Sequence, residues 1–334
     1  MSKVTHFTCI DGNTAGNPVR IVTDPILKLR GNTMMEKRLH FLKEFDWIRK
    51  GLMFEPRGHD MMSGSFFFDP INVSNDVSIL FIETSGCLPM CGHGLIGAIT
   101  ILIEENLISP KVRGTIRVET PAGLIVADYK QEGEKVTAVK FTNIDSFLHA
   151  TDLEIEHPDL GKLKVDVAYG GNFYAIVDPQ ENFKGVENYT AINLISYSKT
   201  LRDLVNELQD FIHPEDSNIY GCSHVLWAGE TLDSSSTARN AVFYGDKAID
   251  RSPCGTGTSA RMAQWFAKEK LQVGSTFIHE SFIGSKFRGK VEKETSIGNL
   301  KAILPSIEGS ARITGYNTII IDWDDPYAEG FQVI

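Results

Sequence analysis

The feature that most constrains the fold is a short phrase that occurs twice, CGHG at residues 91–94 and CGTG at residues 254–257. Each phrase is followed by a largely apolar stretch with helical spacing, LIGAITILIEENL and TSARMAQWFAKEKL. A helix that is apolar on most of its faces is usually enclosed by protein. The chain is therefore predicted to form two domains, each built around one buried helix that begins at a cysteine.

Short strand-like runs, separated by Gly, Asp, Asn and Pro, fill most of the remaining chain and predict mainly antiparallel, β-rich domains. Two further segments, residues 36–53 and 201–212, have helical spacing. The polar KQEGEK segment is the predicted boundary, which gives a first domain of residues 1–130 plus about 312–334 and a second of residues 131–311. The strand-like runs are THFTCID, PVRIVTD, VSILFIET, TIRVET, GLIVADY, KVTAVKFTN, KVDVAYGG, NAVFYG, KFRGKVE and ARITGYNTIIID.

Composition excludes several classes of function. Hydrophobic residues make up 42% and charged residues 23% of the 334 residues, as is typical of globular proteins. The net charge of −10, with no block of Lys and Arg, argues against a nucleic-acid partner. The longest apolar run, residues 95–103, is far shorter than the roughly 20 residues that cross a bilayer, and the N-terminus lacks the apolar core of a secretory signal. Five irregularly spaced cysteines argue against a disulfide framework. These features predict a cytoplasmic protein without a membrane partner.

The two phrase cysteines, Cys91 and Cys254, are the predicted catalytic pair. A helix N-terminus offers unpaired N–H groups and the positive end of the helix dipole, which favour a thiolate. Two reactive thiols at matching places in two domains can take a proton from one face of a carbon and return one to the other. One thiolate and one thiol is the predicted working state, and stereoinversion is the predicted chemistry.

The residues beside Cys91 allow more than one interpretation. Gly92 would let a ligand approach the backbone, and His93 could form a hydrogen bond with a polar substrate group. Cys91 could instead be a buried structural cysteine. A metal site made of Cys87, Cys91 and His93 is disfavoured because no second Cys/His pair completes it, so no metal is predicted.

The residues around Cys254 suggest an anion site. Gly255 and Thr256 place N–H donors at a helix start, which suits a carboxylate, whereas a nucleotide is disfavoured because GxxxxGK[ST] is missing. Asp250 either binds a substrate ammonium group or forms a turn with a salt bridge to Arg251. His224, in SHVLWAG, either faces the site or is structural.

Two polar, glycine-rich phrases, DGNTAGNPVR and EPRGHDMMSG, are predicted to be ordered loops that line a site or tight structural turns. Two other functional classes stay open. A cysteine hydrolase would pair one cysteine with one histidine and leaves the second CGxG cysteine unexplained. A module that only binds imino acids has no need of two opposed thiols.

The motifs IDGNTAGNPVRIV, EPRGH, LPMCGHG, TPAGL, GGNFYAIV, DRSPCGTGTSA and ITGYNTIIID resemble the proline racemase family, which includes 4-hydroxyproline 2-epimerases and trans-3-hydroxyproline dehydratases. The resemblance runs nearly end to end. It implies an α/β (α+β) fold similar to diaminopimelate epimerase, with two pseudo-symmetric β-rich domains, each around a central helix, and the active site between them. It also implies a homodimer with a complete site in each subunit, and a reaction that uses neither pyridoxal phosphate nor a metal.

The resemblance assigns a role to each candidate residue. Dehydratase members replace the first cysteine by Ser or Thr, so the presence of both cysteines favours an epimerase or racemase. ARMAQ and NTIIIDWDDPYAEGF resemble hydroxyproline-catabolic members, which predicts conversion of trans-4-hydroxy-L-proline to cis-4-hydroxy-D-proline, with proline racemase or 3-hydroxyproline 2-epimerase as alternatives. Asn13 departs from the pattern, since many relatives have His there. The implied roles are acid and base for Cys91 and Cys254, carboxylate and substrate binding for Gly92, His93, Gly255 and Thr256, amine binding for Asp250, and substrate binding for His224.

Overall fold

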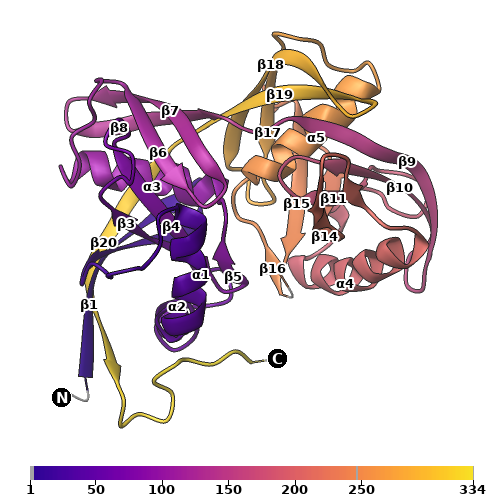
Figure 1. The fold of residues 1–334 in the computed structure, drawn as a ribbon. Coiled ribbons are helices and arrows are strands. Elements are labelled where there is room, and N and C mark those ends of the chain that lie inside the picture. The colour runs from indigo at the N-terminus through magenta and orange to yellow at the C-terminus, as the bar shows by residue number, and fades with distance from the viewer. Residues whose placement is uncertain (1–3, 246, 334) are drawn as a thin grey trace. The chain divides into compact units, whose positions relative to one another are not determined.

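The computed structural model describes residues 4–245 and 247–333 (Figure 1). The chain divides into two compact units, Met1–Phe141 with Gly309–Ile334, and Thr142–Glu308. The sequence-based boundary after residue 130 falls inside the first unit, in the hairpin of β7 (Gly123–Glu132) and β8 (Lys135–Thr142).

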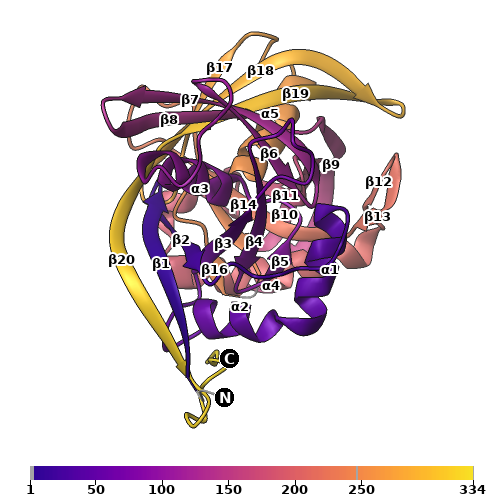
Figure 2. The same cartoon turned by 60° about the vertical axis from the view of Figure 1, so that its left-hand side comes forward.

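The first unit is built on one mixed sheet. β1 (Val4–Thr14) pairs antiparallel with β2 (Asn17–Asp24) on one side and with β20 (Ala311–Asp322) on the other, and both views show β20 running along β1 (Figure 2). β2 is parallel to β3 (Ser63–Phe68), and β3 is antiparallel to β4 (Val77–Glu83). β4 carries the short β5 (Gly86–Leu88) and lies parallel to β6 (Thr115–Thr120), which continues antiparallel into β7.

The central helix of this unit is α3 (Gly92–Glu104), which contacts β1, β2, β3 and β20. All but its last residue are buried, as its apolar sequence predicts. The predicted helix over residues 36–53 is instead two helices, α1 (Met34–Glu44) and α2 (Asp46–Met53). Phe45 separates them because its backbone leaves the helical region, with φ −130° and ψ 8°.

The strands of the second unit close into a ring. The order is β9 (Ser146–His157), β10 (Gly161–Tyr169), β11 (Phe173–Val177), β14 (Cys222–Gly229), β15 (Ala238–Tyr244), β17 (Thr276–Glu280), β18 (Lys286–Ile297) and β19 (Leu300–Gly309). The ring closes where Ala302 and Ile303 of β19 pair with Phe147 and Ser146 of β9. A closed sheet leaves no unpaired edge at this seam.

The central helix of the second unit is α5 (Gly255–Ala267), which contacts β9, β10, β11 and β18 (Figure 1). Its middle turns are buried, including Ala260 and Met262 at 0% exposure. The predicted helix over residues 201–212 is longer than expected at its start and shorter at its end. It is α4 (Ala191–Leu208), which begins at a Thr190 capping box and packs on β14. The remaining short elements are η1 (Val186–Asn188), β12 (Ile212–His213), β13 (Asp216–Tyr220) and β16 (Ala248–Ile249).

The two units repeat the same topology. An antiparallel hairpin, β1–β2 or β10–β11, is followed by helical segments and by a strand parallel to its second strand, β3 or β14. An antiparallel partner follows, β4 or β15, then a short strand, the central helix, a parallel strand and an antiparallel hairpin. This repeat confirms the predicted pair of pseudo-symmetric, β-rich units, each with a central helix. Within the described residues, no helix combines the length and apolarity needed to cross a membrane.

Candidate active site

Cys91 occupies the N-cap position of α3, as predicted. Its backbone is extended, with φ −142° and ψ 114°, and its carbonyl accepts the hydrogen bond of Leu95 N–H at 2.9 Å. Its Sγ accepts a hydrogen bond from Gly94 N–H at 3.3 Å, so the thiol takes the place of a capping hydroxyl. Gly92 is the first helical residue, and His93 follows it.

Three polar side chains surround the Cys91 thiol. The thiol donates to Glu83 Oε1 at 3.0 Å, and Sγ lies 3.6 Å from His93 Nδ1. Ser63, on β3, also donates to Glu83 Oε1, at 3.3 Å. All four side chains are at most 7% exposed, so Cys91 sits in a buried polar cluster beside the last residue of β4.

The first sequence phrase, DGNTAGNPVR, forms the β1–β2 hairpin against this cluster. Ala15 and Gly16 have positive φ angles, 48° and 91°, as a two-residue hairpin loop requires. The Asn13 carboxamide accepts from Gly16 N–H at 3.1 Å and so stabilises the turn. Asn17 places its side-chain amide 3.1 Å from His93 Nε2. This phrase is therefore a structural turn that also fixes the His93 ring.

The second phrase, EPRGHDMMSG, ties down the C-terminal segment. The Arg57 guanidinium donates to the carbonyls of Gly51, Tyr327 and Ala328 at 2.6 to 2.8 Å. This segment acts as a structural turn within the first unit.

Cys254 occupies the matching N-cap position of α5, but with a different backbone. Its φ of +66° and ψ of 116° place a non-glycine residue in a sparsely populated conformation. Thr258 N–H donates to the Cys254 carbonyl at 2.8 Å, and Gly257 N–H donates to Sγ at 3.4 Å. Gly255 is the first helical residue and Thr256 the second. The expectation that both phrase cysteines begin a central helix is confirmed.

Tyr174, on β11, reaches the Cys254 thiol from the sheet of the same unit. Its hydroxyl lies 3.3 Å from Cys254 Sγ and 2.6 Å from Thr256 Oγ1. His224 stands opposite Tyr174 in the β11–β14 register, with ring centroids 4.7 Å apart. Burial lowers the pKa of His224 below its usual value, although part of the residue reaches solvent. The structure thus brings Cys254, Thr256 and His224 together through Tyr174.

Asp250 shapes the turn that leads into Cys254. Its Oδ1 accepts from Ser252 N–H at 2.7 Å and from Ser252 Oγ at 2.8 Å, and the Ser252 hydroxyl in turn accepts from Cys254 N–H at 3.2 Å. The residue is 3% exposed. Of the two interpretations offered by the sequence, the turn-forming role is the one that these contacts support directly.

Burial dominates the electrostatics of both thiols. Desolvation and the Glu83 carboxylate raise the pKa of Cys91 well above that of a free thiol. Desolvation and the Asp250 charge raise the pKa of Cys254 to about 12. The Gly94 and Gly257 N–H groups lower these pKa values, but by less than burial raises them. At both thiols, burial therefore outweighs the effect of the helix N-terminus, which by itself favours a thiolate.

Glu83 and Tyr174, the two side chains from the sheets that touch the thiols, were not predicted from the sequence. Cys87, which the sequence grouped with Cys91 and His93, lies on β5 opposite Ile82. Glu83 takes its place, with potential ligand atoms of Glu83, Cys91 and His93 within 4.8 Å of one another. Within this cluster the Cys91 thiol contacts both of the other groups, Glu83 Oε1 at 3.0 Å and His93 Nδ1 at 3.6 Å. The signals available were a Glu at the end of the apolar run VSILFIE and the Tyr in GGNFYAIV.

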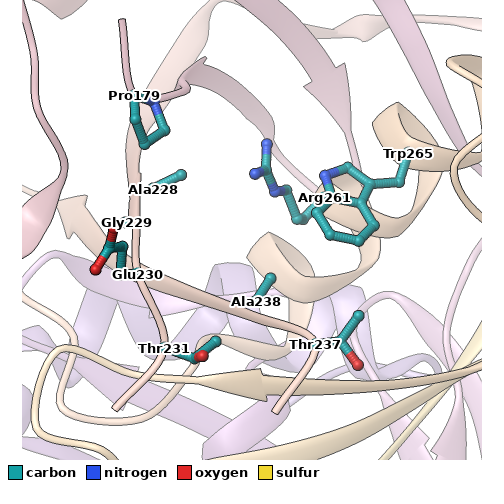
Figure 3. Close-up of a pocket in the computed structure, with 9 residues that line it drawn as sticks. All are labelled: Pro179, Ala228, Gly229, Glu230, Thr231, Thr237, Ala238, Arg261 and Trp265. Carbon is teal, nitrogen blue, oxygen red and sulfur yellow. The ribbon is translucent and has the colours of Figure 1, made fainter. Parts of the chain in front are cut away.

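A depression lies on the second unit, and Cys254 is not among the residues that line it (Figure 3). It measures about 420 Å³ and is lined by Glu230, Thr231 and Thr237 and by Arg261 and Trp265 from the later turns of α5. The Arg261 guanidinium stacks over the Trp265 ring and pairs with Asp178 at 2.5 Å. None of the predicted site residues lines this depression, and the Arg261 guanidinium in its lining is already paired with Asp178. The depression is therefore not the candidate active site.

Comparison with known proteins identifies the family. The family described as proline racemase matches the chain from residue 9 to residue 332. This chain belongs to the proline racemase family. A protein of Spirosoma linguale named 4-hydroxyproline 2-epimerase is 63% identical over 330 residues, which cover 98% of this chain and 99% of the relative. A 4-hydroxyproline 2-epimerase of Brucella suis biovar 1 is 59% identical over 327 residues, which cover 98% of each chain.

Two solved structures share the fold of this chain. A hydroxyproline epimerase from Agrobacterium vitis, with bound trans-4-hydroxy-L-proline, aligns with a TM-score of 0.86 and 25% identity over 100% of this chain and 96% of its own. A PhzF-family phenazine biosynthesis protein from Bacillus anthracis aligns with a TM-score of 0.65 at 15% identity, over 94% of this chain and 99% of its own. The second comparison shows only a common fold.

Proposed function

We propose that this protein is an epimerase that inverts Cα of a proline-type imino acid, converting trans-4-hydroxy-L-proline to cis-4-hydroxy-D-proline without a cofactor. The observation that carries the proposal is the 63% identity, over almost the whole chain, to a protein named 4-hydroxyproline 2-epimerase. The matching N-cap positions of Cys91 and Cys254 in two units of the same topology support it. A single-cysteine hydrolase would leave this repetition unexplained.

In the proposed mechanism, the two thiols act on opposite faces of one Cα. In the L to D direction the Cys91 thiolate takes the Cα proton, and the Cys254 thiol donates a proton to the other face; in the reverse direction the roles exchange. A Cα proton beside a carboxylate is very weakly acidic, so the developing negative charge must be stabilised. The backbone N–H groups of Gly92 and His93, and of Gly255 and Thr256, are the proposed carboxylate donors. Asp250 and His93 are the proposed amine partners, and His224 a further substrate contact.

Dehydration and proline racemisation are the closest alternatives. Elimination of water from 3-hydroxyproline needs one strong base, and family members with that activity lack the first cysteine, whereas Cys91 is present here. Proline racemisation would use the same pair of thiols. The choice of 4-hydroxyproline over proline rests on the names of the relatives.

The test is to incubate the purified protein in D₂O separately with trans-4-hydroxy-L-proline, trans-3-hydroxy-L-proline and L-proline. Chiral chromatography with mass detection then measures the epimer and the deuterium at Cα. We expect the 4-hydroxy compound to yield its cis-D epimer, with L-proline nearly unlabelled. Preferential labelling of L-proline would make the protein a racemase, and loss of water from the 3-hydroxy compound a dehydratase. Absence of labelling in all three would reject the proposal.

Tyr174 is expected to support Cys254 in this reaction. Burial and the neighbouring thiol raise the pKa of Tyr174 well above 10, so its hydroxyl keeps its proton and can donate to a Cys254 thiolate. Loss of one such hydrogen bond, worth about 1 to 1.5 kcal/mol, predicts that Tyr174→Phe lowers kcat about tenfold with little change in KM. Steady-state epimerisation measures both. The matched control is Tyr189→Phe, whose ring stacks on Phe183 with centroids 5.3 Å apart. Equal kcat in the two variants would remove Tyr174 from the mechanism.

The family resemblance also supports a cytoplasmic homodimer with a complete site in each subunit. We expect light scattering coupled to size-exclusion chromatography to give twice the 37.1 kDa of one chain. The balance of 33 basic and 43 acidic residues supports the absence of a nucleic-acid partner.

A further inference from the structure

Glu83 places a buried carboxylate beside Cys91. It ends β4, and its residue is 4% exposed. Among the residues that the structure describes, neither Lys nor Arg forms an ion pair with its carboxylate. A buried charge is costly unless it is paired or well hydrogen-bonded. A buried carboxylate at position 83 is therefore expected to have a functional role.

Among the side chains that donate hydrogen bonds to the Glu83 carboxylate, one is readily ionisable. Oε1 accepts from the Cys91 thiol at 3.0 Å and from Ser63 Oγ at 3.3 Å, and Oε2 accepts from Ser85 Oγ at 3.3 Å. The two serines cannot take up or release a proton near neutral pH. The Cys91 thiol is the ionisable group among these three hydrogen-bond donors, so it is the group with which Glu83 could exchange a proton directly.

We propose that Glu83 is the proton partner of Cys91, holding the thiol in place and accepting its proton when Cys91 becomes the base. The proposal rests on the function proposed above. In the transfer the S–H bond breaks, its electron pair stays on sulfur, and the proton forms an O–H bond with Oε1. The pair holds one proton and one negative charge before and after this step. Once the thiolate has taken the Cα proton of the L-substrate, the pair holds two protons, and the reverse reaction begins from that state.

The surroundings of Cys91 leave Glu83 as the main control of its ionisation. Four groups face the Cys91 thiol: Ser63 on β3, Glu83 on β4, and the His93 ring and Gly94 N–H on α3. After burial, the Glu83 carboxylate is the largest cause of the raised pKa of Cys91, both by its charge and by its hydrogen bond to the thiol. Neutralising this carboxylate should make the thiol easier to ionise in solution. It should also remove the internal acceptor that the reaction uses.

The test measures the ionisation of Cys91 without substrate. In a Cys254→Ser background, the rate of carboxamidomethylation of Cys91 by iodoacetamide is followed by peptide mass spectrometry as a function of pH. We expect Glu83→Gln to move the midpoint of this profile down by roughly one pH unit or more, because a neighbouring charge is lost. With Cys254 intact, Glu83→Gln should lower kcat for trans-4-hydroxy-L-proline at least tenfold. Glu83→Asp, which keeps the charge on a shorter side chain, should lie between wild type and Glu83→Gln in both readouts.

The matched control is Glu104→Gln, at the other end of the same helix. The Glu104 side chain is likewise buried, with 3% exposure, but it pairs with Lys135 at 2.8 Å. The Glu104→Gln substitution should leave the alkylation profile of Cys91 unchanged. If Glu83→Gln has the same alkylation midpoint as the Cys254→Ser parent, the proposal is overturned. If Glu83→Gln does not fold, an unchanged midpoint in Glu83→Asp would do the same. Because alkylation needs no substrate, failure of this proposal is distinguishable from a wild-type protein that epimerises nothing.

Discussion

Replacing either Cys91 or Cys254 by serine should nearly abolish epimerisation while the fold survives. A serine hydroxyl is a far weaker acid than a thiol, so it neither forms the required anion nor matches its partner in proton transfer. General acid or base catalysis contributes roughly 10²–10⁴-fold, and each single variant should lose a factor in this range. The measurement is conversion of trans-4-hydroxy-L-proline by chiral chromatography, with circular dichroism to verify the fold. Both cysteines are non-glycine N-caps, so serine keeps the backbone requirements of each position.

The chain supplies a matched control for this experiment. Cys222 is buried on β14 in the second unit, and its thiol donates to the Phe173 carbonyl at 3.7 Å. A serine there can donate to the same carbonyl, so Cys222→Ser should retain most of the activity. Substantial epimerisation by Cys91→Ser or Cys254→Ser would rule out the two-thiol scheme.

The helix-start positions of Cys91 and Cys254 could be predicted because helix starts are local. The CGHG and CGTG phrases place a small, cap-forming residue directly before a long apolar stretch, and both central helices begin there. The repeated phrase also predicted two units of the same architecture. Strand pairing then confirmed a repeated topology that sequence similarity between the halves does not reveal.

The side chains that touch the thiols could not be predicted in the same way. Tyr174 is 80 residues from Cys254 along the chain, and the two meet only because β11 packs against α5. Glu83 is eight residues from Cys91, at the end of a strand that reads as apolar core. Such contacts depend on sheet register and on helix placement, and the local spacing of residues in the sequence predicts neither.

The raised pKa values of the two thiols could not be predicted either, for a related reason. The sequence reveals the local effect of a helix N-terminus, which lowers the pKa of a thiol. It does not reveal how completely the rest of the unit covers Cys91 and Cys254, which are 6% and 9% exposed. Desolvation and the neighbouring carboxylates outweigh the local effect at both positions.

Gly170, in the turn between β10 and β11, should tolerate no side chain, because the first turns of α5 pack directly on its backbone. A Cβ there would lie 2.5 Å from Ala260 N and closer still to the Thr256 carbonyl oxygen, both of which are backbone atoms. Gly170 O also accepts from the Asn143 amide at 3.0 Å, and the same amide donates to Ser259 Oγ at 2.9 Å. The turn and the helix start are thus locked together, and neither can move without disturbing the other.

Gly170→Ala should therefore lower both stability and activity. Overpacking of this kind costs about 1–3 kcal/mol or more, which predicts a fall in Tm of roughly 5 °C or more. Because Thr256 carries the strain and lies next to Cys254, we expect kcat for epimerisation to fall at least tenfold below the melting transition. The matched control is Gly315→Ala on β20, where the nearest atom to a new Cβ would be 3.8 Å away. Wild-type Tm and kcat in Gly170→Ala would show that α5 is free to shift, and that the position of Cys254 does not depend on this contact.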